Sequence, residues 1–67
     1  MTAWKVGALA AYLEAEDAAG LAAIVRSNSV NGADVLALDA ATCAEALRCT
    51  PFAARELLAL RDKYLAT

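Results

Sequence analysis

The chain has 67 residues, of which 61% are hydrophobic, and its formal net charge at pH 7 is -2. A chain of this length forms one domain at most and leaves little room for an enclosed catalytic cleft. The acidic balance argues against a general binder of nucleic acids, because such proteins carry a clustered basic surface. Alanine supplies much of the apolar content and is the best helix former, so the composition favours several packed helices.

Charged residues interrupt every apolar run well before the roughly 20 residues that a membrane span needs. In the first half of the chain these residues are Lys5, Glu14, Glu16, Asp17 and Arg26. The apolar N-terminal run carries one positive charge and then turns acidic, which is unlike a secretory signal peptide. We therefore expect a soluble protein that works in the cytoplasm and does not bind membranes.

Two helices are predicted in the first 26 residues. From Trp4 to Glu14, apolar residues recur at helical intervals, which predicts a short amphipathic helix. Glu16 and Asp17 then predict the start of a second helix, because acidic groups complement the positive end of the helix dipole. Gly20 costs about 1 kcal/mol relative to alanine inside a helix and leaves a later start open.

A polar loop and two short helices are predicted in the middle of the chain. The segment "RSNSVNG" ends the second helix, and its one apolar residue, Val30, is expected to point inward. The turn signal Asn31-Gly32 precedes a short helix over residues 33–38, which must be held by packing. Asp39 is a suitable N-cap for the next helix, "AATCAEAL".

The last predicted helix has the clearest start. Thr50 is the expected N-cap, and Pro51 occupies the first helical position, where its missing N–H costs nothing. From Phe52 the apolar pattern runs to Leu65, which makes this helix the longest. No stretch alternates with period two, so the sequence predicts an all-α bundle of five helices, with short central helices and a long C-terminal helix.

The order and spacing of these elements resemble the sterile alpha motif (SAM) domain over essentially the whole chain, which gives one domain over residues 4–65. The matching positions are Trp4, Val6, Leu9, Tyr12 and Leu13 in the opening, Val30, Asn31 and Gly32 at the turn, and Val35, Leu36, Leu38 and Asp39 after it. Arg55 matches an arginine of the family's last helix. Two positions depart from the family pattern: Arg48-Cys49 replaces the usual Gly-Ile, and Ala53 replaces a common glycine. These departures affect the expected angle between the last helix and the other helices.

The resemblance implies a protein-protein interaction module that associates with itself or with another SAM domain, without a cofactor. In this family a mid-loop face binds the end-helix face of a second molecule, and the domains usually sit inside longer chains. The corresponding mid-loop residues are Asp34, Asp39 and Glu45, and the corresponding end-helix residues are Arg48, Thr50, Phe52 and Arg55. For any one charged residue, we favour the alternative of an ordinary solvated charge with some intrachain pairing.

The aromatic residues have two possible roles each, in the core or at a contact. Phe52 either packs inward against the first turn of the last helix or projects as an anchor, and we favour the inward orientation. Trp4 and Tyr12 are expected in the core, because they lie at helical spacing with other apolar residues. Tyr64 is expected to be half exposed.

The alternative function is binding of an RNA hairpin, which a few SAM domains perform with a basic patch. Here Lys5, Arg48 and Arg55 are the candidates, with Arg61 and Lys63 some turns further on. Because phosphate contacts need several neighbouring cations, the acidic net charge argues against nucleic acid as the partner.

Neither catalysis nor metal binding is indicated. The chain has no histidine, and its carboxylates and lysines are scattered over predicted helix surfaces. Ser27 and Ser29 have no candidate base near them in the sequence. Cys43 and Cys49 are too few for a cysteine-only zinc site, so we expect two free thiols in the core, of which Cys49 is the more accessible.

Overall fold

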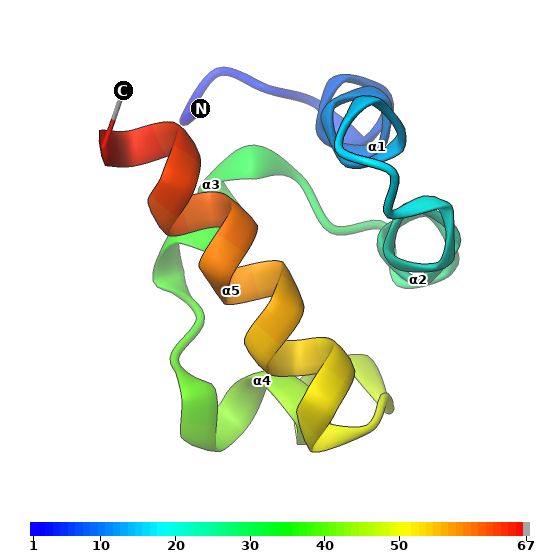
Figure 1. Cartoon of the computed structure of the whole chain (residues 1–67), viewed down its shortest axis with the longest axis vertical. Coiled ribbons are helices and arrows are strands. Elements are labelled where there is room, and N and C mark those ends of the chain that lie inside the picture. The colour runs from blue at the N-terminus through cyan, green and yellow to red at the C-terminus, as the bar shows by residue number, and fades with distance from the viewer. Residues whose placement is uncertain (67) are drawn as a thin grey trace.

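The computed structural model describes residues 1–66, except for the side chain of residue 40, and within this range it contains five α-helices and no strand (Figure 1). The helices are α1 (Val6–Ala15), α2 (Ala19–Ser27), α3 (Gly32–Ala37), α4 (Ala40–Leu47) and α5 (Pro51–Ala66). The predicted all-α architecture, with short central helices and a long last helix, is confirmed.

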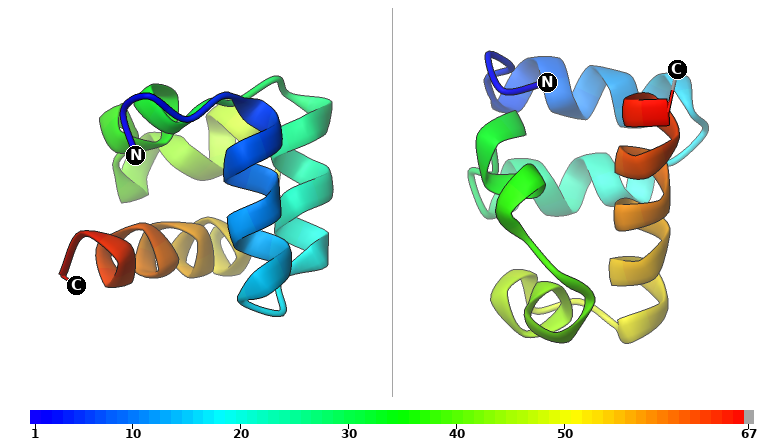
Figure 2. Two further views of the ribbon diagram at one scale, coloured as in Figure 1. Left: turned by 90° about the horizontal axis from the view of Figure 1, so that it is seen from above. Right: turned by 90° about the vertical axis from the view of Figure 1, so that its left-hand side faces the viewer.

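The helices form two packed pairs that are joined by the short α3. Helices α1 and α2 lie side by side and antiparallel, and α5 runs crosswise to both of them (Figure 2). Helix α4 packs against the N-terminal part of α5, at the end of the molecule away from α1 (Figures 1 and 2). Helix α3 contacts both α1 and α5, so it connects the two pairs.

Every helix contributes to a single core. The largest fully buried side chains are Leu9, Leu13, Val25, Val35, Cys43 and Leu57. Full burial of one such aliphatic side chain contributes about 1.5–3 kcal/mol. Buried alanines such as Ala10, Ala22 and Ala54 lie between these larger groups and allow the helices to approach closely. Within residues 1–66 no charged or polar side chain is buried, so apolar packing dominates the stability of the bundle.

Three of the four connections between helices begin with the same turn, a Schellman motif. The residues with positive φ are Asp17 (60°), Ser29 (54°) and Arg48 (53°), and each directly follows the last residues of a helix. The next residue along the chain donates its N–H to a carbonyl five residues earlier: Ala18 to Leu13, Val30 to Val25, and Cys49 to Ala44. Each motif reverses the chain and turns an apolar residue toward the core.

The first two helices begin later than the sequence predicts. Trp4 lies outside α1, in a turn that its own N–H closes by bonding to the Met1 carbonyl at 3.0 Å. Helix α2 begins at Ala19, so the prediction that Glu16 and Asp17 form its first turn is wrong. The physical reason is that Asp17 adopts a left-handed conformation that ends α1, and the late start near Gly20 describes α2 better.

The predicted caps of the last two helices are confirmed. The Asp39 carboxylate accepts a hydrogen bond from the Thr42 N–H at 2.8 Å, and the Thr50 hydroxyl accepts one from the Ala53 N–H at 3.1 Å. Both oxygens satisfy N–H groups that have no partner inside the helix. These two short polar side chains therefore set where α4 and α5 begin.

Gly32 is required by a close approach of two chain segments. Its φ is not positive, and its N–H donates to the Trp4 carbonyl at 2.9 Å. A Cβ at this position would collide with the Met1 carbonyl oxygen and would lie 2.9 Å from the Trp4 Cβ. The N-terminal segment consequently packs directly on the start of α3, which the turn signal alone did not reveal.

Three aromatic rings close the C-terminal end of α5. The ring centroids of Trp4, Tyr12 and Tyr64 are separated by 4.8–5.6 Å, in tilted or edge-on arrangements. The Tyr12 hydroxyl donates to the Leu60 carbonyl at 2.9 Å, and burial, followed by the nearby Glu16 carboxylate, raises the pKa of Tyr12. All three rings are partly buried, so they hold the N-terminal segment and α1 against the last turns of α5.

Candidate protein interaction surface

The predicted end-helix residues lie together at the α4–α5 turn and on the first two turns of α5. We call Arg48, Thr50, Phe52 and Arg55 the end-helix surface, and all four are exposed. Phe52 is 76% exposed, the highest value among the large apolar side chains of residues 1–66. The favoured inward orientation of Phe52 is therefore wrong.

The orientation of Phe52 follows from the helical period. The buried face of α5 is formed by Ala54, Leu57 and Leu58. At 3.6 residues per turn, position 52 lies on the opposite side of the helix from these three residues. Phe52 projects into solvent as a consequence, with Arg55 one turn further on.

Both arginines of the end-helix surface lack an ion-pair partner among residues 1–66. Three other basic residues are paired within the chain: Arg26 with Glu14 at 2.7 Å, Arg61 with Asp62 at 2.9 Å, and Lys63 with Glu16 at 2.6 Å. Neither Arg48 nor Arg55 makes such a contact, so their charges are available to another molecule.

The backbone of the end-helix surface is set by local hydrogen bonds. The Thr50 hydroxyl caps α5, which fixes the first turn that carries Phe52. Arg48 occupies a left-handed position (φ 53°, ψ 43°) at which glycine is favoured, and glycine is what the SAM pattern has there. An exposed aromatic side chain is thus presented from an ordered helix start.

The predicted mid-loop carboxylates are exposed, but two of the three have intrachain roles. Asp34 forms a capping box with Asn31 at the start of α3: the Asp34 N–H donates to the Asn31 side chain at 2.8 Å, and the Asn31 N–H donates to the Asp34 carboxylate at 3.1 Å. The pKa of the Asp39 carboxyl lies below its ordinary value because the Thr42 N–H and hydroxyl donate to it. Glu45, on α4, is exposed and has no intrachain ion pair within residues 1–66.

The five basic candidates for RNA binding do not form one patch. The Arg61 guanidinium donates to the carbonyls of Val35 and Leu38, at 3.3 and 2.7 Å, and Lys63 is paired with Glu16. Lys5 precedes α1, which lies at the end of the molecule away from the α4–α5 turn (Figure 2). Only Arg48 and Arg55 belong to the region of the α4–α5 turn and the start of α5, which is few for a phosphate-binding surface.

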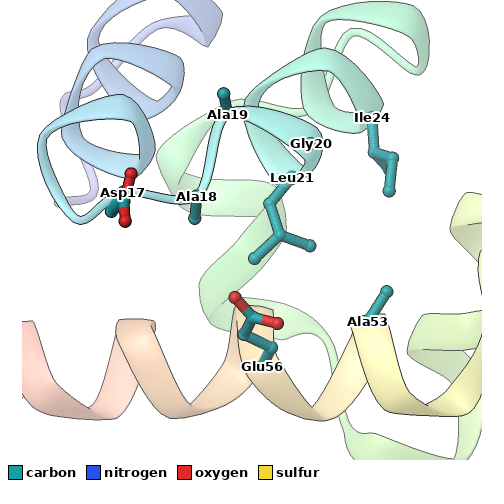
Figure 3. A pocket seen from close by; sticks show the side chains of 8 residues that line it. All are labelled: Asp17, Ala18, Ala19, Gly20, Leu21, Ile24, Ala53 and Glu56. Atoms are coloured by element: carbon teal, nitrogen blue, oxygen red, sulfur yellow. The ribbon is translucent and has the colours of Figure 1, made fainter.

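A groove that the sequence did not reveal lies between the start of α2 and the start of α5 (Figure 3). We call it the α2–α5 groove. It has a volume of about 300 Å³ and is lined by Asp17, Ala18, Ala19, Gly20, Leu21, Ile24, Ala53 and Glu56. Its walls combine polar and apolar surface in similar amounts and include the carboxylates of Asp17 and Glu56. Four adjacent or facing positions carry alanine or glycine, and this run of small residues is the signal that accompanies the hollow.

The two cysteines are free thiols, as the sequence predicts. Cys43 is fully buried, and this burial, followed by the proximity of Cys49, raises the pKa of its thiol. Cys49 is only partly buried and packs against the core. Within residues 1–66 no three potential metal ligands come together.

Among residues 1–66 no helix has the length and apolar content required to cross a membrane. Comparison with known proteins finds no matching family model, no matching curated protein and no matching solved structure.

Proposed function

We propose that the chain is a SAM-type protein-protein interaction module that works in the cytoplasm, without a cofactor, and associates with a second copy or with another SAM domain. The observation that supports this most directly is Phe52, which is 76% exposed. Arg48 precedes it and Arg55 follows it in the sequence, and neither arginine has an ion-pair partner within residues 1–66. An exposed large apolar group on an ordered helix gains free energy when a partner removes it from water. The two free thiols are compatible with a reducing compartment.

The residue types of the end-helix surface are suited to binding proteins. Aromatic side chains and arginine are enriched at the centres of protein interfaces, where they contribute most of the affinity. Arg48 and Arg55 flank the aromatic ring, so they would steer an acidic partner surface toward it. The apolar ring would supply affinity, because exposed ion pairs contribute only about 0–1 kcal/mol each.

The acidic counterpart in this proposal is the mid-loop face of the partner. Glu45 is the carboxylate of this face without an intrachain role, while Asp34 and Asp39 also cap helices. A capping carboxylate has further lone pairs for a second donor. A contact between two different faces builds chains where it does not close on itself, and pairs where it is capped.

The experiment is the measurement of molar mass against concentration by analytical ultracentrifugation. We expect association of the unmodified chain, its loss in Arg55→Glu and in Glu45→Lys, and its recovery as a mixed dimer when the two variants are combined. Glu45→Lys is preferable to a change at Asp34, because the latter also breaks the capping box of α3.

Lys5→Glu is the matched control, since it makes the same charge change on an exposed residue far from the end-helix surface. The proposal is wrong if the unmodified chain stays monomeric at millimolar concentration and binds no SAM domain. It is also wrong if Lys5→Glu weakens association as much as Arg55→Glu does.

A further inference from the structure

The α2–α5 groove and the exposed Phe52 occupy adjoining faces of the same two turns of α5. Ala53 and Glu56 line the groove, whereas Phe52, which immediately precedes Ala53, does not. The helical period places Phe52 beside Glu56, at the outer edge of the groove and directed away from the core. A molecule that covers Phe52 therefore also reaches the groove.

The groove has the size that a phenyl ring needs, and part of its lining is aliphatic. Leu21 and Ile24 point from α2 toward α5, and Ala53 faces them from α5 (Figure 3). Its volume is about 300 Å³. A cavity of about 150 Å³ that is lined by aliphatic and aromatic side chains binds benzene. The groove therefore has space for one aromatic side chain.

The charges around the groove are opposite to those around Phe52. Asp17 and Glu56 line the groove, and neither makes an ion pair within residues 1–66 (Figure 3). Phe52 lies between Arg48 and Arg55, which are also without ion-pair partners in that range. When Phe52 of one copy enters the groove of another, the arginines near Phe52 come to face the carboxylates that line the groove.

We propose that Phe52 of one copy binds in the α2–α5 groove of a second copy, and that the second copy's Phe52 binds in the groove of the first. The inference rests on the proposed self-association through the end-helix surface, and it assigns the acceptor to the α2–α5 groove in place of the mid-loop face. Since donor and acceptor adjoin on one helix, the two contacts form together around a two-fold axis. Such a contact is satisfied at the dimer and does not continue into chains.

Gly20 offers a way to fill the groove without disturbing the fold. Gly20 lies in α2 at an exposed groove-lining position, and a Cβ there meets no atom within 4 Å. Gly20→Leu is compatible with the helix and occupies the space that Phe52 would take. Gly7→Leu in α1 is the matched control, because Gly7 is also helical and exposed and a Cβ there also meets no atom within 4 Å.

The test is sedimentation equilibrium of the chain and four variants, with folding verified by circular dichroism. We expect the mass to level off at twice the 6.9 kDa of the monomer. Gly20→Leu and Phe52→Ala should each weaken the dimer by roughly tenfold or more. Gly7→Leu should leave it unchanged. Methyl NMR signals of Leu21 and Ile24 should shift on dilution of the unmodified chain.

Two results overturn the inference. If Gly20→Leu associates as tightly as Gly7→Leu and the Ile24 signal is independent of concentration, the groove is not the acceptor. If the mass rises beyond the dimer and Glu45→Lys abolishes this, the mid-loop face is the acceptor and the proposed function stands. A monomeric unmodified chain refutes the inference, and it refutes the proposed function as well only if the chain also binds no SAM domain.

Discussion

The two ends of α5 carry similar side chains that are used in different ways. At the C-terminal end, Arg61 binds two backbone carbonyls, Lys63 pairs with Glu16, and Tyr64 packs on Trp4. At the N-terminal end, Arg48, Phe52 and Arg55 have no such contacts within residues 1–66. At the C-terminal end of α5, the aromatic residue and its neighbouring cations stabilise the fold. At the N-terminal end, the corresponding side chains remain available to another molecule.

The difference lies in what each end of the helix meets. The C-terminal turns meet the N-terminal segment and the end of α3, which present an indole ring and the carbonyl groups that Arg61 binds. Near the N-terminal turns, the start of α2 presents alanines and a glycine. Phe52 lies on the face of α5 opposite the buried residues, so no other helix covers it.

The largest expected effect is a difference in stability between variants at the two ends of α5. Trp4→Ala removes a partly buried indole that contacts two tyrosines, and it should lower the free energy of unfolding by about 2–3 kcal/mol. Phe52→Ala should change it by no more than about 0.5 kcal/mol, because the ring is mostly exposed. Urea unfolding followed by circular dichroism measures both values. Equal losses for Trp4→Ala and Phe52→Ala would remove the distinction between the two ends.

A smaller effect is expected for the arginines. The Arg61 guanidinium is 18% exposed and serves two carbonyls at the end of α3. Arg61→Met should therefore lower the free energy of unfolding by about 1.5–3 kcal/mol, the range for hydrogen bonds to charged groups. Arg55→Met should stay within about 0.5 kcal/mol of the unmodified chain. Urea unfolding measures both values. If Arg61→Met leaves the free energy of unfolding unchanged, the hydrogen bonds from Arg61 to the α3 carbonyls do not contribute to stability.

The smallest expected effect is a gain. Ser29 and Arg48 hold left-handed conformations that cost a non-glycine residue about 1–2 kcal/mol, part of which is offset by the larger unfolded-state entropy of glycine. Ser29→Gly and Arg48→Gly should each raise the free energy of unfolding by about 0.5–1 kcal/mol. Thermal unfolding measures the gain and ultracentrifugation measures association. Ser29→Gly should leave association unchanged, whereas Arg48→Gly should weaken it. If the two variants associate equally tightly, Arg48 does not take part in the contact.

Helix starts were predictable where a capping side chain hydrogen-bonds to the backbone a few residues later. Asp39, Thr50 and Pro51 mark the starts of α4 and α5 as expected, because N-capping involves residues only three positions apart. Val30 points inward as predicted, since a single apolar residue in a polar loop has one favourable environment. The start of α2 was predicted too early because acidic residues are typical of a helix start. Here they lie at the end of the preceding helix instead.

Contacts between distant segments were not predictable in the same way. Arg61 lies 26 and 23 residues from the carbonyls that it binds, and Tyr12 lies 48 residues from its acceptor Leu60. Nothing local in the sequence selects these partners. The orientation of Phe52 was misjudged for a related reason, because the choice between core and solvent depends on which face of α5 meets the other helices.

The sequence by itself determined the helical class, the number of helices and most of their ends, because helix propensity, capping and periodicity act over a few residues. Tertiary structure alone decided which charges are paired, that Gly32 must admit the N-terminal segment, and that Phe52 faces solvent beside a groove. The physical reason is that pairing and burial depend on which surfaces the packed helices bring together, and alanine-rich helices can pack in several ways with similar local energies.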